Sequence, residues 1–154
     1  YGHSMGGSVA IEAAQLLGTR VETLIVAEPN LYAGGGLYSR KIAAQTEAEF
    51  IASGYHAMLA AETSPWAGCL QNSAPWALWR SASSLIAGAT PSWFTRFINL
   101  QCRKALIYGS LSLPAQEAMD VENEGIAVVV VPQAGHSMAW ENPAALASVI
   151  AGLI

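Results

Sequence analysis

The chain has 154 residues, of which 53% are hydrophobic and only 12% are charged, and its formal net charge is −4. This composition suits one globular domain with a real apolar core and excludes a disordered chain. The basic residues form no cluster longer than a pair, so we expect no nucleic-acid partner. The longest apolar run, Ile126–Val131, is too short to cross a bilayer, so we expect no membrane span.

The two cysteines bear on the redox compartment of the protein. Cys69 and Cys102 have neither the spacing of a metal site nor that of a disulfide framework. Two free, partly buried thiols favour a reducing compartment, and we therefore expect a cytoplasmic location.

The chain starts at Tyr1 rather than at a methionine, and a functional motif follows at once. We expect the sequence to be the C-terminal part of a longer protein.

A helix and a strand come first along the chain. Ser4–Leu17 is rich in small residues, and its apolar spacing predicts a helix that ends at Gly18. One face of this helix is expected to carry Val9, Ala13, Leu16 and Leu17. Val21–Ala27 is apolar and β-branched, which predicts a strand that stops at Pro29.

The segment 31–101 differs in character from the rest. It begins with a glycine-rich loop and continues as short pieces with helical patterns. We expect a small helical insert, whose aromatic side chains form either its own core or the wall of an apolar ligand pocket. Its aromatic residues include Phe50, Tyr55, Trp66, Trp76, Trp79, Trp93, Phe94 and Phe97.

The C-terminal third returns to strands and helices. Lys104–Tyr108 and Ile126–Val131 are predicted as strands, the second of them buried. Leu113–Glu124 between them is predicted as a helix with Pro114 in its first turn. Asn142 suits the N-cap of a closing helix that runs to the end of the chain.

Apolar strands that alternate with helices indicate an α/β protein with a parallel sheet covered on both faces. We divide the chain into a first sheet segment at 1–30, the helical insert at 31–101 and a second sheet segment at 102–154.

The sequence GHSMG at the start of the chain fits the pattern G-x-S-x-G, with Ser4 as its serine. A serine hydroxyl is a weak nucleophile, so it must stand exposed on a sharp strand-to-helix turn where a base reaches it. Such a turn leaves little room two residues before and after, which accounts for Gly2 and Gly6, while Gly7 eases helix packing. The N–H of Met5 could donate to an oxyanion. The alternative is a chance match in which GHSMGG only caps a helix.

The letters GHSM recur around His136, but the serine of this copy lacks the second glycine, since Ala139 stands there. His136 follows the last predicted strand. Because the carboxyl ends of parallel strands share one edge of a sheet, we expect His136 to meet Ser4 there and to act as general base. The alternative is a loop histidine bound to water.

The other two histidines suit this task less well. His3 precedes Ser4, and adjacent residues at a sharp turn point in different directions, so we expect His3 to have a positioning or packing role. His56 lies in the helical insert.

GHSMGG at the start of a small-residue helix and AGHSMAWENP between the last strand and the last helix together resemble the α/β-hydrolase superfamily. The resemblance extends over nearly the whole chain. It implies an α/β-hydrolase fold whose N-terminal strands and second oxyanion donor are absent, with 31–101 as a cap or lid. It implies no metal and no organic cofactor.

The acid of such a site is less obvious. In the family pattern it follows the strand before the histidine, but Ser110–Pro114 contains no carboxylate. Glu28 ends the strand after the nucleophile helix, which resembles haloalkane dehalogenases, and could orient His136. The alternatives are Asp120, the only aspartate, and no acid at all.

We therefore predict a serine hydrolase that acts on an ester or related acyl substrate through Ser4, His136 and Glu28, with the Met5 N–H in the oxyanion hole. The aromatic insert favours a small apolar or aromatic acyl compound as substrate. The other hypotheses are a non-catalytic ligand-binding protein of this fold, and a C–C bond hydrolase or cofactor-free peroxidase that uses the same side chains.

Overall fold

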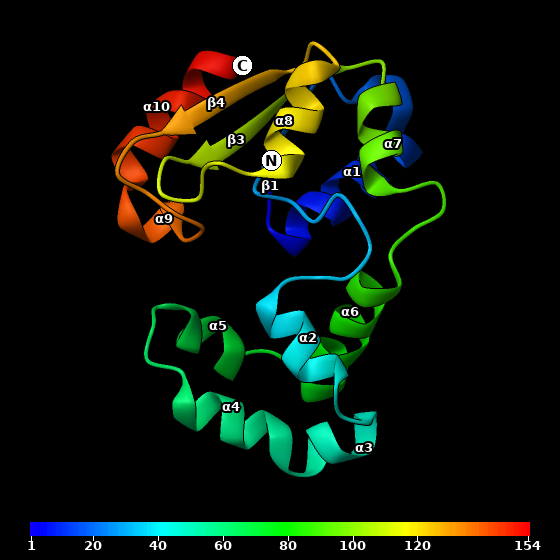
Figure 1. Cartoon of the computed structure of the whole chain (residues 1–154), viewed down its shortest axis with the longest axis vertical. Coiled ribbons are helices and arrows are strands. Elements are labelled where there is room, and N and C mark those ends of the chain that lie inside the picture. The colour runs from blue at the N-terminus through cyan, green and yellow to red at the C-terminus, as the bar shows by residue number, and fades with distance from the viewer. The chain divides into compact units, whose positions relative to one another are not determined.

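The computed structural model describes all residues, 1–154, and they form two units (Figure 1). The sheet unit comprises Tyr1–Leu31 and Thr90–Ile154, and the helical unit comprises Tyr32–Ala89. None of the helices is long and apolar enough to span a membrane. Cys69 is exposed, Cys102 is half-buried, and both are free thiols.

The sheet unit has the predicted α/β architecture. Its four strands are all parallel and follow the order β1-β2-β3-β4. The elements in chain order are β1 (Gly2–His3), α1 (Met5–Leu17), η1 (Gly18–Arg20), β2 (Thr23–Ala27), α7 (Trp93–Asn99), β3 (Arg103–Gly109), α8 (Gln116–Asn123), β4 (Ala127–Val131), α9 (Met138–Glu141) and α10 (Pro143–Leu153).

The register places the carboxyl ends of the strands at one edge of the sheet. His3 pairs with Ala27, and Ala27 pairs with Ile107, two residues before β3 ends at Gly109, so β1, β2 and β3 all end near the same edge. Helices cover both faces. Leu146 of α10 packs against the face that carries Ala27 and Ile107, and right-handed connections place α1 and α8 on the opposite face.

The apolar side chains that the spacing places on one face of α1 are not its buried residues. Its buried residues are small or medium in size, whereas Val9 and Leu16 are 60% and 84% exposed. The small residues allow close packing, since a Cβ on Gly7 would lie 2.6 Å from the Cβ of Pro29. The side of α1 that faces inward is therefore marked by close approach and not by large apolar side chains. The buried residues are Gly7, Ser8, Ile11 and Ala14.

Two details of the C-terminal third also differ from expectation. In β4, Ala127 and Val130 are exposed, because β4 lies at the edge of this four-stranded sheet and is not enclosed. The helix α8 begins at Gln116, so Pro114 precedes the helix and is not in its first turn. The predicted N-cap of α10 is confirmed: the side chain of Asn142 accepts a hydrogen bond from the backbone N–H of Ala145.

The helical unit has an apolar core of its own. Phe50 and Tyr55 are buried in it, and the Tyr55 hydroxyl donates to the carbonyl of Leu70 at 3.1 Å. Trp66 and Trp79 pack against this core. The elements are α2 (Leu37–Ala43), α3 (Glu47–Glu49), η2 (Phe50–Gly54), α4 (Tyr55–Ala61), α5 (Trp66–Gln71) and α6 (Pro75–Ala87).

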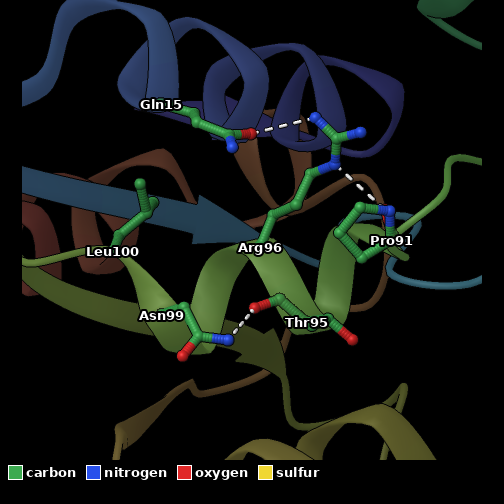
Figure 2. A pocket seen from close by; sticks show the side chains of 6 residues that line it. All are labelled: Gln15, Pro91, Thr95, Arg96, Asn99 and Leu100. Carbon is green, nitrogen blue, oxygen red and sulfur yellow. Dashed lines mark hydrogen bonds between the residues drawn. The ribbon is translucent and has the colours of Figure 1, made fainter.

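Polar contacts tie α7 to α1 within the sheet unit. The Arg96 guanidinium donates through Nη1 to Glu12 at 2.8 Å and to Gln15 at 2.9 Å, and Trp93 Nε1 donates to Glu12 at 2.9 Å. Arg96 Nε also donates to the carbonyl of Pro91 (Figure 2). The surface pocket at this junction is therefore built around a guanidinium already engaged by protein groups. It is lined by Gln15, Pro91, Thr95, Arg96, Asn99 and Leu100.

We predict that Arg96→Ala lowers the free energy of unfolding by about 1–2 kcal/mol, because it removes a charge-assisted hydrogen bond to Glu12 that is partly shielded from water. Urea unfolding measures the change. Arg20→Ala is the matched control, since Arg20 is exposed and makes a 3.4 Å contact with the carbonyl of Leu17. Equal effects of the two substitutions would contradict the proposed role of Arg96.

Candidate active site

Ser4 occupies a sharp turn between β1 and α1. Its backbone angles, φ 53° and ψ −128°, lie in a region that residues other than glycine rarely adopt. The N–H of Ser4 donates to the carbonyl of Ala27 at 2.9 Å, and the carbonyl of Ser4 accepts from the N–H of Gly7 at 2.8 Å. These bonds hold the strained turn at the edge where the strands end.

The two glycines that flank this turn, Gly2 and Gly6, have different steric surroundings. A Cβ on Gly2 would overlap the carbonyl oxygen of Gly6 and lie 2.7 Å from the Cβ of Ala10, so the turn requires glycine there. A Cβ on Gly6 would meet no atom within 4 Å. The expected steric need for glycine at Gly6 was therefore wrong, because this side of the helix is open.

Glu28 follows β2 directly, with φ 39°, and its side chain is only 8% exposed. Its Oε1 accepts from the N–H of Gly109 at 2.9 Å, and its Oε2 lies 2.7 Å from Nδ1 of His136. Burial raises the pKa of Glu28, but hydrogen bonds from His136, Gly109 and Ser112 together outweigh it and hold the pKa below the ordinary value of 4.5. Glu28 is therefore an ionised acceptor at neutral pH.

His136 lies between Glu28 and Ser4, with its Nε2 3.0 Å from the Oγ of Ser4. An ionised carboxylate can only accept, so Nδ1 carries a proton, and the tautomer with its proton on Nδ1 has an Nε2 lone pair that can accept from the serine hydroxyl. The structure thus brings the three predicted side chains into one hydrogen-bonded chain. Asp120, the alternative acid, lies on α8 and accepts from Gln116 at 2.7 Å. His56 lies on α4 in the helical unit.

Met5 is the first residue of α1, directly after the serine. Its N–H therefore has no acceptor within the helix, and the positive end of the helix dipole lies beside Ser4.

The loop that carries His136 is held by backbone contacts that the sequence pattern did not predict. The N–H of Gln133 donates to Oγ of Ser110 at 2.9 Å, and the N–H of Gly135 donates to Oε2 of Glu141 at 2.7 Å. His3, expected to lean away from Ser4, points its Nε2 at the carbonyl oxygen of His136, 2.7 Å away.

Gly109 lets this loop approach the end of β3, because a Cβ there would lie 2.6 Å from the carbonyl oxygen of Gly135. The glycine at the end of the predicted strand in YGSLSLP was the one signal of this approach. The non-glycine residues with positive φ are Ser4, Glu28 and Gln133, and all three border the site.

We predict that Ser112→Ala raises the pKa of Glu28 toward 4.5, because the Ser112 hydroxyl donates to the ionised carboxylate. The stability that a lowered pKa confers is present above about pH 4.5 and is lost as pH falls through the folded-state pKa. Ser112→Ala should therefore be less stable than wild type by about 1 kcal/mol at pH 7, with the difference shrinking in acid.

Carbon-13 NMR of the carboxyl group and unfolding curves at several pH values measure both effects. Ser110→Ala is the control, since the Ser110 oxygen accepts from Gln133 and its loss should leave the pKa of Glu28 unchanged. A Glu28 pKa that is the same in Ser112→Ala and wild type would refute this role of Ser112.

Solved structures with the same fold include three enzymes with different named activities. An esterase from Exiguobacterium antarcticum has a TM-score of 0.69 at 18% identity, covering 98% of this chain and 64% of that one. A haloalkane dehalogenase from Agrobacterium tumefaciens has a TM-score of 0.66 at 13% identity, covering 98% of this chain and 64% of that one. N-formylmaleamic acid deformylase from Pseudomonas putida has a TM-score of 0.63 at 17% identity, covering 97% of this chain and 64% of that one.

The chain thus spans less than two thirds of the length of each of these three proteins. No curated protein matches the sequence. The family model described as "Alpha/beta hydrolase family" matches residues 1–149. This match, together with the parallel sheet and the fold of the similar structures, shows that the chain belongs to the alpha/beta hydrolase family.

Proposed function

We propose that the protein is a serine hydrolase that cleaves an ester or a related acyl compound, with Ser4 as nucleophile, His136 as general base and Glu28 as the acid that orients it. The observation that carries this proposal is the continuous chain of contacts from Glu28 to His136 at 2.7 Å and from His136 to Ser4 at 3.0 Å. Each contact lies within hydrogen-bond reach for proton transfer.

In the first half of the reaction, Nε2 of His136 takes the hydroxyl proton as Oγ of Ser4 attacks the acyl carbon. The carbonyl oxygen becomes an oxyanion, toward which the N–H of Met5 is placed to donate as one member of an oxyanion hole. Collapse of this intermediate breaks the bond to the leaving alcohol, which takes the proton from His136. Ser4 then carries the acyl group as an ester.

The second half repeats these steps with water. His136 takes a proton from the water as its oxygen attacks the acyl-enzyme, and it returns the proton to Oγ of Ser4 as the acid product leaves. In both halves His136 passes through an imidazolium. The ionised, nearly buried carboxylate of Glu28 stabilises that charge more than a fully solvated carboxylate would, because water screens it less.

The proposal of an acyl substrate rests on the chemistry of Ser4, His136 and Glu28 and not on the aromatic residues. Phe50 and Tyr55 are buried in the core of the helical unit, and Trp93 and Phe97 are buried in the sheet unit. These four side chains therefore do not support the expectation of an apolar or aromatic acyl group, which stays a prediction. The hypothesis of a non-catalytic binder rested on the missing acid in 110–114, and the contact of Glu28 with His136 removes that support.

We predict that a fluorophosphonate probe labels the full-length protein at Ser4 and that Ser4→Ala abolishes the label. Hydrolysis of short nitrophenyl esters should fall on the order of 10⁶-fold, as expected when a nucleophile is removed from such a unit. Mass spectrometry of the labelled peptide and steady-state kinetics measure the two results.

The matched control is Ser137→Ala, the serine of the second GHSM, whose side chain makes no cap contact. It should keep both label and turnover. Labelling that persists in Ser4→Ala, or ligand binding by a wild-type protein that is neither labelled nor active, would refute the proposal.

We further predict that Glu28→Gln lowers kcat on the order of 10⁴-fold, because a neutral amide no longer fixes the Nδ1–H tautomer or stabilises the imidazolium. KM for the same nitrophenyl ester should change little. Glu22→Gln provides the control, since Glu22 is exposed and lies immediately before β2. Similar kcat values for Glu28→Gln and wild type would exclude Glu28 as the acid.

A further inference from the structure

His3 makes a contact that the proposed reaction does not use. Its Nε2 lies 2.7 Å from the carbonyl oxygen of His136, and the centroids of the two rings are 4.8 Å apart. A carbonyl oxygen can only accept, so Nε2 of His3 carries a proton and donates it.

We propose that His3 is a positioning residue, which holds the backbone of His136 through this hydrogen bond and so fixes the distance between base and nucleophile. The inference rests on the proposed function of Ser4 and His136. It assigns His3 no proton transfer to the substrate.

The position of His136 needs such support. Its side chain is 55% exposed, so packing alone does not hold the ring in place. Its loop is fixed at Gln133 and at Gly135 through their N–H groups. The bond from His3 adds a contact at the carbonyl of His136 itself.

His3 suits this task because it ends β1, the strand that leads directly into the nucleophile Ser4. It pairs with Ala27 in the sheet, and it immediately precedes Ser4, whose N–H binds the carbonyl of the same Ala27. The same two-residue segment, His3–Ser4, thus binds Ala27 and the carbonyl of His136. The gap between Oγ and Nε2 is constrained from both sides.

The charge state of His3 fits this role. Burial lowers the pKa of His3 and the neighbouring His136 lowers it further, while the bond to the carbonyl and the charge of Glu28 act in the opposite direction with a smaller effect. The pKa therefore lies below 6.5, and His3 is neutral at neutral pH. A neutral donor adds no positive charge beside the imidazolium that forms on His136.

The test compares His3→Gln with His3→Leu in the full-length protein. The amide nitrogen of glutamine corresponds in position to Nε2 of histidine, whereas leucine has no donor. We expect His3→Leu to lower kcat for a nitrophenyl ester about 10–100-fold with KM within about twofold, because the base is misplaced while substrate binding is kept. His3→Gln should recover kcat to within about fivefold of wild type.

Amide hydrogen exchange gives a readout that needs no activity. Exchange at Gly135 and His136 should be at least about tenfold faster in His3→Leu than in wild type and near the wild-type rate in His3→Gln. If His3→Leu fails to fold, His3→Asn replaces it, since the asparagine amide corresponds to Nδ1 and cannot reach the same carbonyl.

Wild-type kcat and exchange in His3→Leu would overturn the inference. Equal damage in the Gln and Leu variants would also overturn it, because it would show that the ring packs rather than donates. An unlabelled wild-type Ser4 would instead refute the proposed function, and the exchange rates would still decide whether His3 holds the loop.

Discussion

The carboxylate of Glu28 joins three parts of the sheet unit that are distant in sequence. It follows β2, accepts from the N–H of Gly109 at the end of β3, and contacts His136 in the loop after β4. Burying an ionised carboxylate without hydrogen-bond donors would strongly destabilise the folded state. Because Glu28 is buried, it needs each of these contacts. The same contacts that satisfy the charge also place His136 against Ser4. Folding and the proposed chemistry therefore depend on one ionised group.

The sequence predicted those parts of this arrangement that depend on local residue patterns. Alternating apolar strands and helices predicted the parallel sheet, and the short turn GHSMGG predicted the position of Ser4. The edge shared by parallel strands then implied that His136 and Glu28 would lie near Ser4, although they are far away along the chain. This step worked because a parallel register fixes where strands end before any side chain is considered.

Other features escaped prediction for a physical reason. The buried face of α1 depends on how closely Gly7 approaches Pro29, which is a tertiary distance with no periodic signature. The contacts that hold the histidine loop involve backbone groups, such as the N–H of Gly135 and the carbonyl of His136. Backbone groups are the same in every residue, so only their partners, Glu141 and His3, could have given a signal, and neither partner is specific for this contact.

The positive φ angles of Ser4, Glu28 and Gln133 have a consequence for how the molecule responds to heat. Each such residue is held in an unfavourable conformation by its surroundings, at a cost of about 1–3 kcal/mol. Because all three border the same edge, a local opening of that edge releases their strain together, which lowers the free energy that the opening costs. Thermal inactivation would then begin with a reversible loosening of this edge, at temperatures where the strands behind it are still paired.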